Sequence, residues 1–166
     1  MNANLGAPFS WFGDNETVLV KLLPSNRKPL LDAKKDLPTG PIISNASGAK
    51  SQNRTYPDML KNKNDEINFE NIITSELYKI TLSGNKTLFK SADMFAGQSL
   101  SPDGNYIMIT TIQKPFSYIV PLNRFPMKSV VYDKSGREVK IVNETPLTEI
   151  MPKGFSSVRT GKRSMG

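Results

Sequence analysis

Histidine and cysteine are both absent from the 166 residues of this chain. A Ser-His-Asp triad needs an imidazole to accept the serine proton, and Cys-His chemistry needs both partners. Structural zinc sites are also built mainly from cysteine and histidine. The sequence has no Gly-x-Ser-x-Gly elbow, the turn that presents the serine of α/β-hydrolases. We therefore expect no enzymatic activity from this chain alone, no catalytic residues, and no bound metal or cofactor.

Long apolar runs and dense clusters of one charge are missing too. No apolar stretch approaches the ~20 residues that a membrane-spanning helix needs. The formal net charge is +7, but the basic residues are dispersed, with short groups only at 27–28, 34–35 and 162–163. A nucleic-acid binder concentrates such charges on one face or in one tail. We expect no membrane span and no nucleic-acid partner, and a basic nucleic-acid binder ranks last among the alternatives.

The apolar segments are short, rich in Val, Ile, Tyr and Thr, and separated by Gly, Asn, Asp and Pro, which is typical of β-strands. Residues 76–82 and 87–89 flank a Ser-Gly-Asn-Lys turn, and residues 129–132 and 138–142 flank Asp-Lys-Ser-Gly. Glycine and asparagine accept the positive φ angles of tight hairpin turns. The sequence therefore predicts two antiparallel hairpins.

A Ser-Pro-Asp-Gly turn followed by the apolar run 106–110 lies between these hairpins, so residues 97–142 contain four predicted strands. This is the usual size of one four-stranded propeller blade. Residues 9–14 and 17–20 repeat the pattern of residues 100–104 and 106–109, which predicts a second such unit. Residues 24–64 lack periodicity and predict a long insertion between the second and third strands of that unit. Helical turns are expected only within 56–73, with a short amphipathic piece beginning at Asp65 and Glu66.

Seven segments carry a family resemblance, and the most specific is the pattern Pro-Phe-Ser-Tyr-x-Val-Pro-x-x-Arg-Phe-Pro that begins at Pro115. The segments are residues 38–41, 54–62, 65–66, 101–104, 114–121, 124–126 and 158–164. In these segments the chain resembles the N-terminal β-propeller of the prolyl oligopeptidase family of serine peptidases, in its glutamyl-endopeptidase-like branch.

The resemblance implies an all-β fold of two four-stranded antiparallel blades of a seven-bladed propeller, with a long irregular insertion in the first blade. The first blade would span about 5–90 with the insertion at 24–75, the second about 97–142, and residues 143–166 would lead to a missing next blade. In this family the propeller covers an α/β-hydrolase domain and gates its substrates. The implied partners are that missing domain, the remaining blades and the peptide substrate of the parent peptidase. The parent would be periplasmic or secreted if a signal peptide has been removed.

Four basic residues are candidates for facing the substrate, where they would pair with a carboxylate. They are Arg124, Arg159, Lys162 and Arg163. The alternative is a solvated linker for the last three and a loop anchor for Arg124. A further aromatic group, Phe9, Trp11 and Phe12, is expected to fill the core rather than to form a ligand platform. Asp14 and Asp103 are expected to be turn residues rather than calcium ligands.

A free-standing β-rich protein that binds a peptide or a glycan is the alternative function, because the same repeats would serve it without a hydrolase partner. Two isolated blades would also expose an unpaired strand edge. We therefore expect self-association of the exposed blade edge as a further property of the chain.

Overall fold

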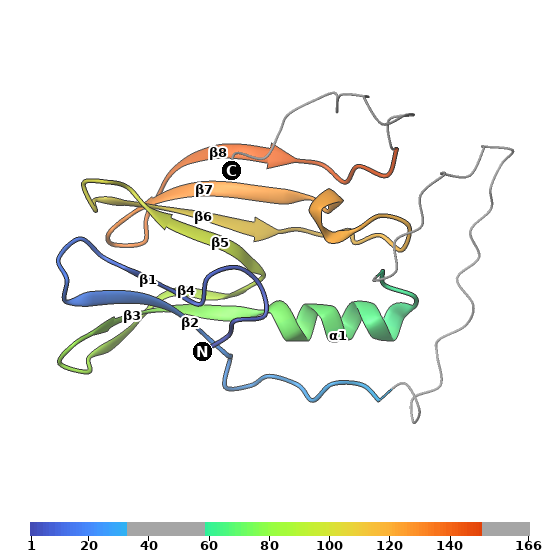
Figure 1. The fold of residues 1–166 in the computed structure, drawn as a ribbon, viewed down its shortest axis with the longest axis horizontal. Helices are drawn as coiled ribbons and strands as arrows, with labels where there is room; N and C mark the ends of the chain where they lie inside the picture. The colour runs from blue at the N-terminus through green and yellow to red at the C-terminus, as the bar shows by residue number, and fades with distance from the viewer. Residues whose placement is uncertain (33–58, 151–166) are drawn as a thin grey trace, which may run out of the picture.

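The computed structural model describes residues 1–32 and 59–150, which form two stacked four-stranded antiparallel sheets (Figure 1). The first sheet contains β1 (Phe9–Trp11), β2 (Thr17–Leu22), β3 (Ser75–Thr81) and β4 (Lys86–Asp93). The second contains β5 (Phe95–Leu100), β6 (Tyr106–Ile112), β7 (Met127–Asp133) and β8 (Glu138–Thr145). In each sheet every strand pairs with its neighbours in sequence, and the described residues close no barrel. This confirms the predicted all-β class and is consistent with propeller blades.

Turn residues explain why the chain reverses where it does. Both predicted hairpins are present, as the pairs β3–β4 and β7–β8. The first turns at Gly84, whose φ of 88° is open to glycine at little cost. The repeated pattern around residues 9–20 and 100–109 corresponds to the pairs β1–β2 and β5–β6, which are the first two strands of each sheet. Local turn chemistry therefore sets the meander of both sheets.

The space between the sheets is filled by apolar side chains from both of them. Leu19 and Leu77 of the first sheet and Ile107 of the second are fully buried, and Phe12 and Phe95 join the same cluster. The predicted core position of Phe12 is therefore confirmed. Each sheet completes the burial of the other, which is the reason why two meanders stack face to face.

Trp11 and Phe9 were expected in this core, and that expectation is wrong. Trp11 keeps 51% of its surface exposed and Phe9 keeps 43%. Successive side chains of a strand point to opposite faces. Because Trp11 pairs with Val18 and Phe9 with Val20, the two rings lie on the face opposite to Leu19.

The helix α1 (Lys63–Ile73) interrupts the long connection between β2 and β3 and extends beyond one end of the first sheet (Figure 1). Asn62 caps its N-terminus by accepting a 2.9 Å hydrogen bond from the amide of Asp65. Asp65 and Glu66 in the first turn favour the positive end of the helix dipole. The helix confirms the predicted helical turns, so the insertion is not irregular throughout. None of the helices in the described ranges is long and apolar enough to cross a membrane.

Residues 1–8 form a strap, our name for the segment that lies across the ends of both sheets and of α1. Asn2 is buried, and its side-chain amide donates to the carbonyl of Ile72 and the hydroxyl of Ser75, both at 2.9 Å. The buried ammonium of Lys21 donates to the carbonyl of Leu5. At Gly6 the φ is 61°, and a Cβ there would overlap the carbonyl oxygen of Ala96 in β5. The strap therefore joins the two sheets and the helix.

Candidate functional site

Of the four predicted substrate-facing residues, only Arg124 lies within the described parts of the chain. Arg159, Lys162 and Arg163 fall in 151–166, outside the described residues. Arg124 is the last residue of the 3-10 helix η1 (Leu122–Arg124), which precedes β7. Its role in binding a carboxylate stays a prediction.

The backbone of Arg124 fixes the loop before β7. Its amide donates to the carbonyl of Pro121 at 2.9 Å, and its carbonyl accepts from the amide of Thr148 at 3.1 Å. The side chain behaves differently, since Nη1 of the guanidinium is buried and has no hydrogen-bond partner among the described residues. A buried guanidinium donor is stabilised by an acceptor, and none of the described residues supplies one.

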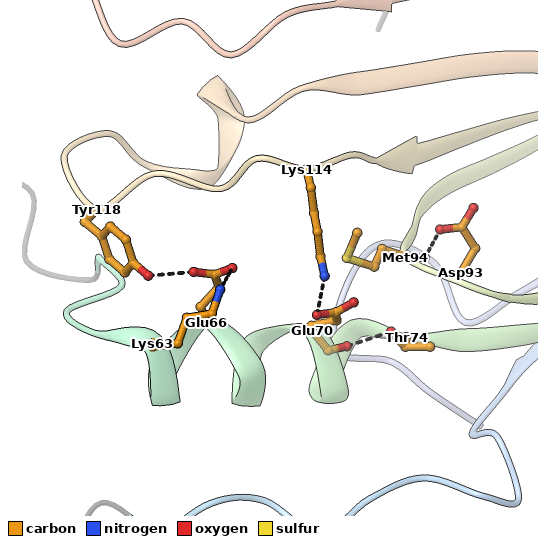
Figure 2. A network of polar contacts seen from close by, with 8 residues as sticks. All are labelled: Lys63, Glu66, Glu70, Thr74, Asp93, Met94, Lys114 and Tyr118. Atoms are coloured by element: carbon orange, nitrogen blue, oxygen red, sulfur yellow. Dashed lines mark hydrogen bonds and ion pairs between the residues drawn. The ribbon is translucent and has the colours of Figure 1, made fainter. Parts of the chain in front are cut away.

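Around Arg124, the loop 113–126 and α1 form a unit that we call the cap. Two polar contacts join its two parts and a third lies within α1, and Figure 2 shows all three. The phenol of Tyr118 donates to Glu66 at 2.5 Å, Lys63 contacts the other oxygen of Glu66 at 2.6 Å, and Lys114 contacts Glu70 at 2.8 Å. Charge-assisted bonds of this kind orient both partners. The cap is thus held by side chains of α1 and of the loop between β6 and β7.

The pKa values of Glu66 and Tyr118 move in opposite directions. Partial burial alone would raise the pKa of Glu66, but hydrogen bonds from Lys63 and Tyr118 and the charge of Lys114 lower it overall. Burial and the bond to Glu66 raise the pKa of Tyr118 to about 12. At neutral pH the pair is therefore an ionised carboxylate that accepts from a neutral phenol.

Aromatic rings form the interior of the cap. Phe69 of α1 meets Phe116 and Phe125 of the loop edge-on, with centroids 5.2 and 5.9 Å apart, while Phe116 and Phe125 stack at 5.4 Å. Such arrangements are favourable for ring quadrupoles. Phe116 and Phe125 both belong to the pattern that carries the family resemblance. That pattern therefore builds a packed cap in which Arg124 directly precedes one ring.

At the opposite end of the sheets, residues of the hairpin turns line a cavity of about 560 Å³ that opens to solvent. Lys79 lies in its wall, with its ammonium 5.2 Å from the ring centroid of Phe12 and 4.9 Å from that of Phe89. The same ammonium donates to the carbonyl of Lys134 in the second sheet. Burial, and secondarily the charge of Lys134, lower the pKa of Lys79.

A second lysine repeats this arrangement one strand away. Lys90 of β4 donates to the carbonyl of Gly136 at 2.8 Å and lies 3.6 Å from the ring centroid of Tyr132. It lines a smaller cavity of about 250 Å³. We call Lys79 and Lys90 the lysine clasp, because both tie the first sheet to the β7–β8 turn of the second. Sequence reasoning missed them, although strand alternation places Lys79 on the same inward face as Leu77.

Two carboxylates lie at the rim of the larger cavity. The pKa of Asp14 is lowered by hydrogen bonds from the amides of Glu16 and Thr17. The hydroxyl of Ser101, followed by the amide and side chain of Asn105, lowers the pKa of Asp103 to about 2. Both stay ionised at neutral pH and neither is suited to donate a proton in catalysis. The prediction that they are turn residues is confirmed by these bonds.

In the described ranges, no three or more Asp, Glu, His or Cys side chains gather where they could hold a metal ion. The described residues form a packed cap that contains the Arg124 guanidinium at one end of the sheets. At the other end, the lysine clasp holds the turns that line the larger cavity. Such an arrangement can confine or orient a ligand, and the polar groups described do not form a nucleophile and base pair.

Comparison with known proteins finds related sequences but no related structure or family model. No protein-family model matches the chain, and no solved structure matches it. Two curated proteins do match, each named "Probable glutamyl endopeptidase, chloroplastic". The chain is 36% identical to the one from Oryza sativa subsp. japonica over 158 residues and 34% identical to the one from Arabidopsis thaliana over 163 residues.

These matches cover 95% of this chain in both cases. The chain spans about a sixth of the relatives' length, 17% of one and 16% of the other. The chain is therefore related to proteins that bear a peptidase name. The predicted resemblance to a peptidase family is confirmed at this level, and the propeller assignment stays a prediction.

Proposed function

We propose that this chain is a non-catalytic part of a prolyl-oligopeptidase-like serine peptidase and that it contributes two blades to an N-terminal seven-bladed propeller. The observation that carries the proposal is the pair of consecutive four-stranded meanders, stacked face to face, in a chain related over 95% of its length to a sixth of two glutamyl endopeptidases. The proposed blades span about 5–90 and 97–142, and residues 143–166 lead to the next blade. The hydrolytic residues lie on sequence that is not in this chain.

In this proposal the two blades gate the substrates of the α/β-hydrolase domain. A wall of stacked sheets narrows the approach to a buried nucleophile, so that short or extended peptides enter and folded proteins are excluded. Such a gate must resist deformation. The shared apolar core and the lysine clasp, which bonds to Lys134 and Gly136 across the sheet interface, support a rigid wall.

Arg124 is the described residue most suited to meet a substrate carboxylate in such a gate. Its buried Nη1 lacks an acceptor among the described residues, and its backbone is fixed at both the amide and the carbonyl. Arg159, Lys162 and Arg163 are proposed to face the same passage. A guanidinium held in this way can form a bidentate pair with a glutamate side chain.

The experiment compares one peptide sequence in two settings, using the full-length protein that contains this chain. The substrate is a short glutamate-containing peptide, offered free and as a loop of a folded host protein. We expect hydrolysis of the free peptide and of the chemically unfolded host, and none of the folded host. The 166-residue chain alone should hydrolyse none of them.

Two results would contradict the proposal. Peptide hydrolysis by the 166-residue chain itself would place the active site within it. Equal cleavage of the folded and unfolded host by the full-length protein would show that no gate operates.

In the same assay, Arg124→Ala should raise KM for glutamate-containing peptides more than Arg124→Lys, while uncharged peptides serve as the control.

A further inference from the structure

The larger cavity lies where the turns of the two sheets meet, at the end opposite α1 (Figure 1). All four hairpin turns contribute to its lining, so both of its walls belong to this chain. Turns of the two sheets touch there, since a Cβ on Gly104 would lie 3.7 Å from the amide nitrogen of Gly13. The volume of about 560 Å³ falls within the range of about 300–1,000 Å³ that is usual for small-molecule sites. The cavity therefore has room for a small ligand.

Two lysines form the cationic side of this cavity. Lys79 and Lys134 both line it, and the ammonium of Lys79 donates to the backbone carbonyl of Lys134. That bond uses one of the three N–H donors of the ammonium, and no other oxygen of the described residues accepts from it. Burial lowers the pKa of Lys79, and the nearby charge of Lys134 lowers it further. A ligand carboxylate would fill the remaining donors and reduce the repulsion between the two ammonium groups.

Two carboxylates form the anionic side. Asp14 directly follows one of the touching glycines, Asp103 directly precedes the other, and hydrogen bonds within each turn keep both ionised. Burial lowers the pKa of Lys79, whereas the charges of Asp133 and Asp14 act to raise it. Asp14 is therefore near Lys79, yet the two side chains form no ion pair. Opposite charges thus line one cavity without neutralising each other by contact.

We propose that this cavity binds a small zwitterion, a molecule with a free ammonium and a free carboxylate, such as an α-amino acid or a dipeptide. Lys79 and Lys134 bind its carboxylate, and Asp14 and Asp103 bind its ammonium. Each pair takes one residue from each sheet, so the bound ligand bridges the two sheets. A molecule with only one of the two charges leaves one side of the cavity unpaired, which provides the selectivity. The proposal does not depend on the peptidase function.

The open position of the cavity sets the expected strength. Ion pairs that water reaches are individually weak, so we expect the zwitterion to dissociate in the millimolar range. Because the ligand needs both sheets in place, it binds the folded chain and not the unfolded one. Saturating ligand should therefore raise the thermal midpoint of the chain.

An NMR titration of the isotopically labelled 166-residue chain measures the binding and locates it. The probes are alanine, dialanine, N-acetyl-dialanine, which lacks the ammonium, and dialanine amide, which lacks the carboxylate. We expect dialanine to shift the amide signals of Gly13 and Gly104 saturably, while Gly97, which does not line the cavity, stays unchanged. Each blocked dipeptide should bind about fivefold more weakly. The tighter of alanine and dialanine gives the length of ligand that the cavity prefers.

Substitutions assign each charge of the ligand to one side of the cavity. Lys79→Met should weaken dialanine binding and abolish the difference between dialanine and its amide. Asp14→Asn should abolish the difference between dialanine and its acetylated form. Lys134→Met tests the cationic side without removing the Lys79 side chain. Lys90→Met is the matched control and should bind dialanine like the parent chain, because Lys90 makes the same kind of bond between the sheets but lines the smaller cavity.

Three results would overturn the proposal. The absence of saturable shifts at concentrations well above the millimolar range would mean that the cavity takes no zwitterion. Equal binding of the free and the blocked dipeptides would show that the paired charges do not recognise the ligand. Equal weakening of all four probes by Lys79→Met and by Lys90→Met would assign the effect to the packing of the sheets. Circular dichroism of each variant verifies that it has folded.

Discussion

Tyr118 and Glu66 show how much of the cap depends on one hydrogen bond between side chains that are 52 positions apart. The bond links the loop after β6 to α1, and neither residue belongs to a strand. A hydrogen bond from a phenol to a carboxylate is stronger than one between two neutral groups, because the acceptor is charged. At the scale of single residues, the cap can therefore be tested by removing one oxygen atom.

Replacing Tyr118 by Phe should lower the free energy of unfolding by about 1–2 kcal/mol, since the ring stays and the bond to Glu66 is lost. Chemical denaturation at neutral pH measures this. Tyr106→Phe is the matched control, because Tyr106 is 44% exposed and should change stability little. Equal effects of the two substitutions would show that the Tyr118 bond contributes nothing.

The same pair predicts how stability changes at high pH. Because the pKa of Tyr118 is raised to about 12 in the folded chain, the unfolded chain loses this proton first. Tyr118 should therefore contribute stability that is present below about pH 10 and is lost as the pH rises toward 12. Denaturation curves over that range should decline less steeply for Tyr118→Phe than for the parent chain. Parallel curves would contradict the assignment.

Substitution of Gly6 is a second change at the residue scale for which the structure predicts a clear loss of stability. With φ at 61° and the Ala96 carbonyl against it, Gly6→Ala adds both backbone strain and overlap. We expect a loss of about 2–4 kcal/mol, the sum of about 1–2 for left-handed backbone and a further steric cost. Thermal or chemical denaturation measures it.

Gly84→Ala provides the control for that substitution. Gly84 also has a positive φ, of 88°, but a Cβ there meets nothing within 4 Å. Gly84→Ala should therefore lower the free energy of unfolding only by the cost of the left-handed backbone, about 1–2 kcal/mol. If both variants were equally stable, the strap would not press against β5 as described.

At the scale of elements, the N-cap residue of helix α1 can be tested by substitution. Asn62→Ala should cost about 1 kcal/mol, because the amide of Asp65 loses its acceptor, and Asn62→Ser should retain most of the stability. Hydrogen exchange of the α1 amides should quicken in the alanine variant more than exchange in β6. Uniform quickening would mean that the helix does not open by itself.

The sequence predicted those elements whose signal is local. Ser-Gly-Asn and Ser-Pro-Asp-Gly turns predict hairpins because each contains residues suited to the required φ angles, and all of these hairpins are present. The pairing of β2 with β3 joins Leu22 to Glu76 across the insertion, and its place was inferred only from the size of a blade. Contacts between distant residues leave no periodic signal in one sequence.

Side chains whose setting depends on the other sheet were predicted least well. Trp11 has the apolarity of a core residue, but its parity relative to Leu19 decides its face, and that parity depends on register. Lys79 and Lys90 have the composition of surface residues, yet they meet carbonyls of the second sheet. Packing between sheets, rather than propensity, determined these positions.

At the scale of the whole molecule, the two sheets should unfold as one unit, because both contribute to the buried apolar cluster that contains Leu19 and Ile107. Leu19→Ala in the first sheet and Ile107→Ala in the second should each cost about 2–5 kcal/mol, since both residues are fully buried. In each variant, the denaturation midpoints from Trp11 fluorescence and from far-ultraviolet circular dichroism should coincide.

Leu88→Ala is the control for this pair, because 51% of the Leu88 surface is exposed. It should change stability by about 0.5 kcal/mol or less. Separate midpoints for the two probes in Ile107→Ala would show that the first sheet survives without the second.

The strap also bears on the order in which the chain is made. Asn2 bonds to Ile72 and Gly6 lies against Ala96, so residues synthesised early find their places only after these later partners leave the ribosome. A nascent chain that has emerged through β4 can pair four strands, but its strap still lacks β5. During that interval the strap is not held in place over Lys21, and the first sheet is exposed to chaperones and proteases. The rate at which β5 emerges from the ribosome should therefore influence the yield of folded protein.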